Sequence, residues 1–203
     1  MLMRFMKPMK SFFCADSFIR QDKGAAAIEF AFIMPFMLFI YFGLVDVTGL
    51  ISANRRIVSA ASTVADLVTQ QRTSILASTI TDQYNAAYVI MQPIPSANVR
   101  IEIFDYRTVG ATITQIWKTN NNKGSSCGSA PSTTGMASLM TASNDVILVR
   151  ACTTYTPAVA SFLGQSIMGA TSFSLSQTIS ARPRSSTTLT CYATTVAAGT
   201  ICT

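Results

Sequence analysis

The 203-residue sequence predicts an α+β protein, in which a long N-terminal helix precedes a domain built on an antiparallel β-sheet. Three observations lead to this fold class. A run of sixteen uncharged, mostly apolar residues extends from Phe30 to Val45. Apolar residues then recur with the period of a helix as far as Met91, and beyond Pro95 apolar and polar residues alternate in short runs.

The apolar run predicts a transmembrane helix over residues 25–54. Twenty-five helical residues extend about 37 Å, which exceeds the ~30 Å hydrocarbon layer of a bilayer. Residues 1–24 hold five Lys or Arg and two Asp. This excess of cations before the helix places the N-terminus in the cytoplasm and the rest of the chain on the far side of a lipid bilayer, after a single pass. A buried core helix is the competing interpretation.

The start of this helix carries a motif. The segment GAAAIEFAFIMPF resembles the processing site of type IV pilin-like proteins, specifically those of the Flp/Tad branch, with Gly24, Glu29 and Phe30 at the motif positions. The acidic Asp46 near the end of the helix and the β-rich remainder are similar to TadE-like minor pseudopilins. We therefore expect the sheet domain to be pilin-like.

The resemblance implies that a prepilin peptidase cleaves between Gly24 and Ala25 and removes residues 1–24 as a basic leader. A glycine before this bond has no Cβ, which eases entry of an extended backbone into a protease cleft. The resemblance further implies a protein of the bacterial inner membrane with its C-terminal domain in the periplasm. Its partners would be other pilins or pseudopilins and the inner-membrane assembly platform of a pilus used in adhesion and biofilm formation. Whether the protein enters the filament is left open.

Two carboxylates of the helix are candidate assembly residues. Cleavage would leave the new α-amino group on Ala25, and Glu29 follows it at position i+4 on the same helical face. Glu29 is therefore expected to pair with this ammonium group or with that of a neighbouring subunit; the alternative is that it lies solvated among the headgroups. Asp46 is about 25 Å further along. It either ends the span at the outer interface or pairs with another pseudopilin helix.

Residues 55–92 predict an extension of the helix outside the membrane. Its apolar stripe is interrupted by polar residues from Gln70 to Ser74, which suggests a break near Arg72, and Pro93 and Pro95 end it. The stripe indicates packing against the domain's own sheet, and a seam between subunits is the alternative. Its members are Ile57, Ala61, Val64, Val68, Ile75, Ile80, Tyr84, Ala87 and Met91.

Residues 98–182 predict the antiparallel sheet, with Gly110 at a turn and a polar loop over residues 119–144. Residues 183–203 form a Thr-rich tail. The expected strands lie at Val99–Ile103, Ile113–Trp117, Asp145–Thr156 and Ser172–Ile179.

The number and placement of the cysteines are consistent with export to an oxidising compartment. Cys14 belongs to the leader, and the other four allow two disulfides in three possible pairings. We favour Cys127–Cys152 and Cys191–Cys202, because each pair would tie an irregular segment locally. A zinc site is disfavoured, since the chain has no His and no C-x2-C spacing, and we expect no metal and no cofactor.

Composition also bears on function. The absence of His excludes Ser-His-Asp and Cys-His catalysis within this chain. No basic run interleaved with aromatics follows the leader, so we expect no nucleic-acid partner. An exported enzyme would have to use five acids that are scattered along the sequence, and we expect none; a membrane-anchored binding or adhesin module with an uncleaved signal anchor remains the main alternative to the pseudopilin. The five acids are Asp66, Asp82, Glu102, Asp105 and Asp145.

Overall fold

The computed structural model describes residues 23–110, 112–133, 136, 144–157, 172–184, 188–192 and 202. The leader up to residue 22, part of the polar loop and most of the tail lie outside the described residues. The chain forms two compact units, residues 1–44 and residues 45–203.

Helix α1 spans Lys23–Thr69 and contains Pro35. Its large apolar side chains are exposed throughout the first unit, whereas from Ala53 onward every third or fourth residue is buried. The exposed part carries apolar residues on all faces, and the buried part carries them on one stripe. Apolar residues on all faces are typical of a helix in lipid, whereas a single apolar stripe is typical of a helix packed on a sheet.

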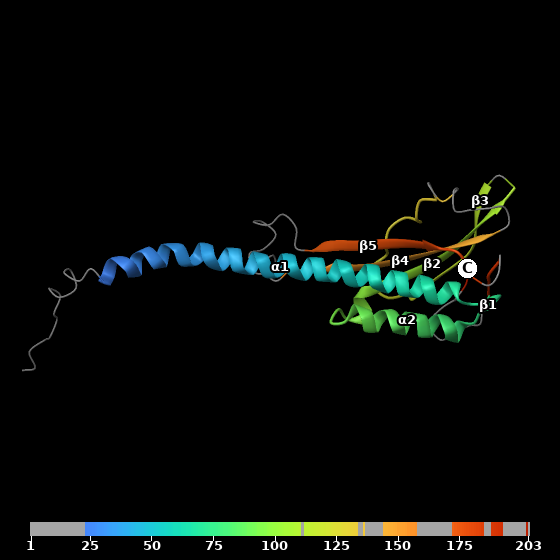
Figure 1. The fold of residues 1–203 in the computed structure, drawn as a ribbon, viewed down its shortest axis with the longest axis horizontal. Coiled ribbons are helices and arrows are strands. Elements are labelled where there is room, and N and C mark those ends of the chain that lie inside the picture. Colours follow the sequence, from blue (N-terminus) through green and yellow to red (C-terminus); the bar gives the residue numbers. More distant parts are fainter. Residues whose placement is uncertain are drawn as a thin grey trace, which may run out of the picture. The chain divides into compact units, whose positions relative to one another are not determined.

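The predicted extension is divided into two helices. After α1 ends, the polar interruption leads through the two-residue strand β1 (Ser74–Ile75) into helix α2 (Ala77–Met91). Helix α2 runs back alongside the C-terminal part of α1 (Figure 1), and Arg56 of α1 donates hydrogen bonds to the carbonyl oxygens of Ile90 and Gln92 at the end of α2. All nine members of the predicted stripe are buried.

The sheet confirms the predicted α+β class. It has four antiparallel strands in the order β3-β2-β4-β5, and Gly110 turns the chain between the first two with φ of +67°. A short 3-10 helix, η1 (Ser96–Asn98), precedes β2. The strands are β2 (Val99–Val109), β3 (Thr112–Asn120), β4 (Asp145–Tyr155) and β5 (Phe173–Ala181).

Both faces of the central strands are covered. On the inner face, residues such as Ile101 and Val149 join the core formed with α1 and α2. On the outer face, Phe104 and Leu148 pack with Met136 from the polar loop. Strands β2 and β4 are therefore buried on both sides, which explains why their sequences are more continuously apolar than that of the edge strand β5.

Two cross-links and a second small sheet hold the irregular segments. The structure forms the disulfides Cys127–Cys152 and Cys191–Cys202, which are the two pairs favoured from the sequence. Strand β6 (Thr190–Cys191) pairs in parallel with β1. The start of the tail is thereby fastened to the connection between the two helices.

Candidate functional site: the N-terminal helix and its motif

The processing motif lies in the first turn of α1. Gly24 is the second residue of this helix and is exposed, and a Cβ added to it would meet nothing within 4 Å. The first four N–H groups of a helix have no partner within the helix, so the bond between Gly24 and Ala25 lies where the helix opens at least cost. The motif is accessible, and glycine is not required there by packing.

Glu29 and Phe30 follow one turn later. Both side chains are exposed, Phe30 by 66%. Within the described part of the chain, no hydrogen bond or ion pair involves Glu29. The carboxylate is therefore available for a partner outside this chain or for the amino group that cleavage would create.

The helix beyond the motif is unusually apolar for a surface. Every large apolar side chain from Ile28 to Val45 is exposed, by between 42% and 72%. Leaving such a side chain in water costs about 1.5–3 kcal/mol relative to burial. In the described residues one helix, Ala26–Thr69, is long and apolar enough to cross a membrane, and none of its most apolar stretch is buried within the protein. A core helix would be buried, so the competing interpretation is not supported.

Asp46 lies among the first residues of the second unit. It is half-buried, and its backbone carbonyl oxygen accepts a hydrogen bond of 3.3 Å from the hydroxyl group of Tyr155 at the end of β4. Burial and, second, the charge of Asp46 raise the pKa of Tyr155. Asp46 therefore lies where α1 begins to contact the sheet.

The fold brings two of the scattered acids together. Strands β2 and β4 place Arg107 opposite Asp145, with Asp105 one step along the same face. The Asp145 carboxylate accepts hydrogen bonds from Arg107 Nε at 2.5 Å, from Arg107 Nη2 at 2.9 Å and from the backbone N–H of Leu189 at 2.5 Å. This pairing was not predicted, because forty residues separate the two acids and only the strand register joins them.

Asp105 has the opposite environment. Both of its carboxylate oxygens are buried and have no hydrogen-bond partner among the residues that the structure describes. Burial and, second, the neighbouring charge of Asp145 raise the pKa of Asp105 to about 8, against smaller lowerings by the charge of Arg107 and by the indole N–H of Trp117. Because both acids are fully buried, the pair offers no surface to a substrate. Among the residues that the structure describes, no group of three or more His, Cys, Asp or Glu side chains could hold a metal ion.

The match to a known protein family is confined to helix α1. Residues 24–66 match the family described as TadE-like protein. No curated protein and no solved structure matches the chain. The family match begins at the motif glycine and confirms the resemblance predicted from Gly24, Glu29 and Phe30.

Proposed function

Because residues 24–66 match the TadE-like family, we propose that the chain is a TadE-like protein of the Tad/Flp pilus system and acts as a minor pseudopilin. In this proposal, residues 25–54 anchor the chain in the bacterial inner membrane and the sheet domain lies in the periplasm. The protein is noncatalytic and is needed for assembly of the pilus, and through the pilus for surface adhesion and biofilm formation. Its partners are other pilins or pseudopilins and the inner-membrane assembly platform.

One observation carries the proposal: an accessible glycine lies in the first turn of a helix whose large apolar side chains from Ile28 to Val45 are all exposed. An ordinary secreted protein has its cleavage site after the apolar stretch. Cleavage before that stretch removes the cations and keeps the apolar helix. Such a product remains in lipid and presents a new N-terminus to neighbouring helices.

Glu29 is the proposed assembly residue. After cleavage the α-amino group of Ala25 lies one helical turn before Glu29, in reach of its own subunit or of a neighbour. A carboxylate at the edge of the hydrocarbon layer is costly unless it is paired. Pairing between subunits would therefore favour one axial register of the helices.

Processing is tested by intact-mass measurement of the protein extracted from membranes of cells that contain the matching prepilin peptidase. We expect loss of residues 1–24, which leaves 179 of the 203 residues. Gly24→Leu should retain the leader and abolish pili; because a Cβ added at this position meets nothing within 4 Å, the effect is expected to come from recognition and not from packing. Gly43→Leu is the matched control: it lies in the same helix, also has nothing within 4 Å of an added Cβ, and should be processed.

Two results would contradict the proposal. Retention of the leader in the unaltered protein would favour a plain signal anchor carrying a binding module. Equal processing of Gly24→Leu and the unaltered protein would show that the peptidase does not read this glycine.

A further inference from the structure

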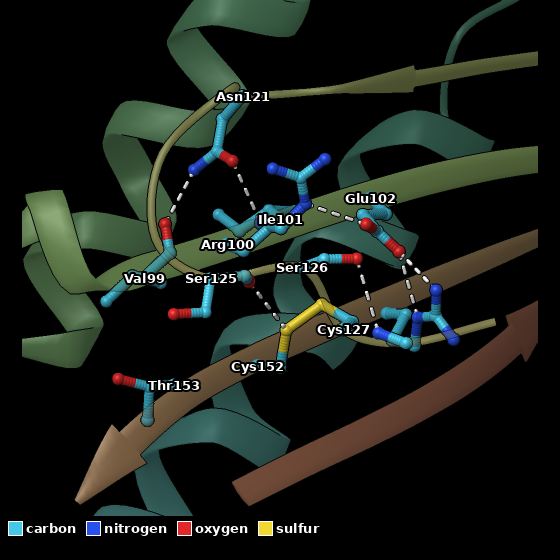
Figure 2. The surroundings of a disulfide bond; sticks show 12 residues. Val99, Arg100, Ile101, Glu102, Asn121, Ser125, Ser126, Cys127, Cys152 and Thr153 are labelled. Carbon is cyan, nitrogen blue, oxygen red and sulfur yellow. Dashed lines mark hydrogen bonds and ion pairs between the residues drawn. A yellow bond between two sulfur atoms is a disulfide. The ribbon is translucent and has the colours of Figure 1, made fainter. Parts of the chain in front are cut away.

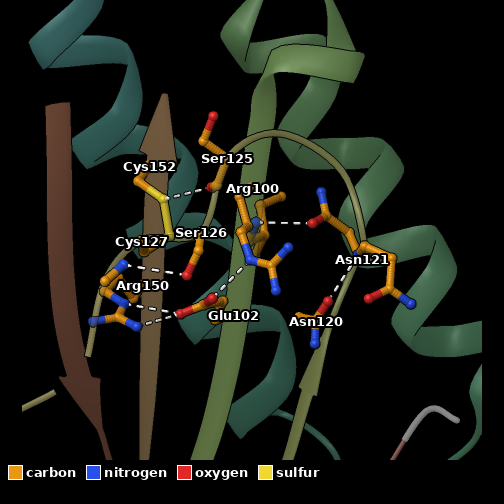
Figure 3. A network of polar contacts seen from close by, with 12 residues as sticks. Arg100, Glu102, Asn120, Asn121, Ser125, Ser126, Cys127, Arg150 and Cys152 are labelled. Carbon is orange, nitrogen blue, oxygen red and sulfur yellow. Dashed lines mark hydrogen bonds and ion pairs between the residues drawn. A yellow bond between two sulfur atoms is a disulfide. The ribbon is translucent and has the colours of Figure 1, made fainter. Parts of the chain in front are cut away.

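The outer face of the sheet carries an ion-pair network that the proposed function does not use. Glu102 on β2 accepts a hydrogen bond of 2.7 Å from Nε of Arg100, and bonds of 2.9 Å and 2.5 Å from Nε and Nη2 of Arg150 on β4 (Figure 3). The side chains of Glu102 and Arg150 are 9% and 8% exposed, and that of Arg100 is 20% exposed. One carboxylate thus holds two guanidinium groups.

The disulfide Cys127–Cys152 holds a loop against the sheet beside this network. The bond from Cys127 to Cys152 fastens the loop that follows β3 onto β4, and Sγ of Cys152 lies 3.9 Å from the carbonyl oxygen of Ser125 (Figure 2). In the same loop, the carbonyl oxygen of Ser129 accepts a bond of 2.5 Å from Nη1 of Arg150. Arg150 is therefore occupied by Glu102 and by the loop, and acts as a fixed positive charge.

A pocket of about 190 Å³ lies between this network and β3. Among the described residues that line it, three are cations and one is a carboxylate. Two side-chain amides add neutral donors. The residues used in this argument are Arg100, Lys118 and Arg150, then Glu102, then Gln115 and Asn120.

Two of the three cations have unused donors. Arg100 gives only Nε to Glu102, and its terminal nitrogens are turned away from that carboxylate (Figure 3). They make no hydrogen bond to the described residues. Lys118 is exposed and forms no ion pair with any described residue. A structural ion pair with Glu102 would need only one cation, Arg150. The fold therefore does not explain why Arg100 and Lys118 add two further positive charges to the same pocket.

We propose that this pocket binds a small oxyanion, a carboxylate or a phosphate group. The planar fork of Arg100 matches the paired oxygens of such a group, and Lys118 adds a mobile point charge at the rim. Glu102 positions Arg100 by holding Nε. The site is separate from the helix motif, so it holds or fails independently of the proposed role in pilus assembly.

The test uses the full chain in nonionic detergent, with inorganic phosphate, glucuronate and glucose as probes at constant ionic strength. Calorimetric titration should show phosphate or glucuronate binding with a Kd of the order of 1 mM, the affinity of a few exposed charged contacts. Glucose has the same ring as glucuronate without the charge and should not bind. The preference between the two anions tells whether phosphate or carboxylate groups are the ligand.

Variants assign the contacts. Arg100→Gln should weaken binding about tenfold or more, the effect of losing charge-assisted hydrogen bonds. Lys118→Gln should also weaken it, and its exposed side chain can be replaced without disturbing the fold. Arg182→Gln removes the same charge from an exposed residue that does not line the pocket, and should bind as the unaltered protein does.

The proposal is overturned if neither anion binds, or if glucose binds as well as glucuronate. It is also overturned if Lys118→Gln and Arg182→Gln bind equally. That comparison decides the matter should Arg100→Gln fail to fold.

Discussion

The two aspartates of the inner face show how far the environment of one residue controls its chemistry. Asp145 receives three hydrogen bonds, two of them from Arg107 and one from the backbone N–H of Leu189. Asp105 lies on the same face of the sheet and receives none from the described part of the chain. Since a buried charge without partners is expensive, the protonated form of Asp105 is the one that suits the fold.

This difference predicts a pH dependence of stability. The folded chain keeps the Asp105 proton up to about pH 8, whereas an ordinary aspartate releases it near 3.8. The unfolded chain therefore binds fewer protons between these values, and the free energy of unfolding falls as the pH rises from about 4 to 8, by up to ~1.4 kcal/mol per pH unit. Asp105→Asn should remove this fall and be the more stable protein at pH 8.

Urea unfolding across this pH range, followed by the fluorescence of Trp117, measures the effect. The exposed Asp82 supplies the matched control, and Asp82→Asn should keep the slope of the unaltered protein. Identical slopes for Asp105→Asn and the unaltered protein would contradict the assignment.

At the scale of elements, the sequence predicted what is long and periodic. The stripe from Ile57 to Met91 repeats often enough to reveal a helix, and its polar interruption marked the division between α1 and α2. Strands β1 and β6 were missed because two residues carry no period, and their pairing joins Ser74 to Thr190 across most of the domain. Such a contact has no local signal.

The helix motif and the proposed anion pocket also differ in how far each can be predicted from the sequence. The motif at Gly24 and Glu29 is contiguous and could be read from the sequence. The anion pocket takes Arg100, Lys118 and Arg150 from three strands, and only the strand register brings them to one place. Isolated cations in strands look like solvated surface residues until that register is known.

The loop after β3 supplies a test of its close approach to the sheet. Gly124 has φ of +63°, and an added Cβ would lie 3.1 Å from backbone atoms of Asn98 and Arg100. Gly110 has a similar φ of +67° in open space. Both alanine variants carry the ~1–2 kcal/mol cost of a left-handed backbone. Gly124→Ala should lose about 1 kcal/mol more, because backbone atoms cannot move aside as a side chain can.

Urea denaturation of the two variants compares these free energies directly. Subtracting the loss measured for Gly110→Ala from that for Gly124→Ala removes the cost of the left-handed backbone, which both variants share. Equal losses would mean that the loop does not pack against the start of β2 as described.

At the scale of the whole molecule, the two parts of helix α1 are suited to different surroundings. The residues of α1 up to Val45 suit lipid, and the stripe from Ala53 suits a protein core. If the helix is the membrane anchor that we propose, insertion and folding depend on different residues of the same element. Assembly, in our proposal, depends on a third kind of residue, a carboxylate that neither the bilayer nor the core uses.

This separation predicts the behaviour of Glu29→Ala. The variant should reach the membrane fraction and be processed normally, since the apolar helix and Gly24 are unchanged. The yield of sheared pili should fall about fivefold or more, the population change that the loss of ~1 kcal/mol of pairing produces. Asp82→Ala is the control: it removes an exposed carboxylate outside the membrane helix and should leave the yield of pili unchanged. Normal piliation of Glu29→Ala would refute the pairing.

The docking of Leu189 has a consequence for the order of events during folding. Its carbonyl oxygen accepts a hydrogen bond of 2.9 Å from the Trp117 indole, and its N–H donates to Asp145. Leu189 follows all four strands of the main sheet along the chain, so a polypeptide that emerges from its N-terminal side delivers this residue after them. Until then the indole lacks its acceptor and the aspartate lacks one of its three donors, so a chain that ends before Leu189 leaves polar groups of the interior unsatisfied.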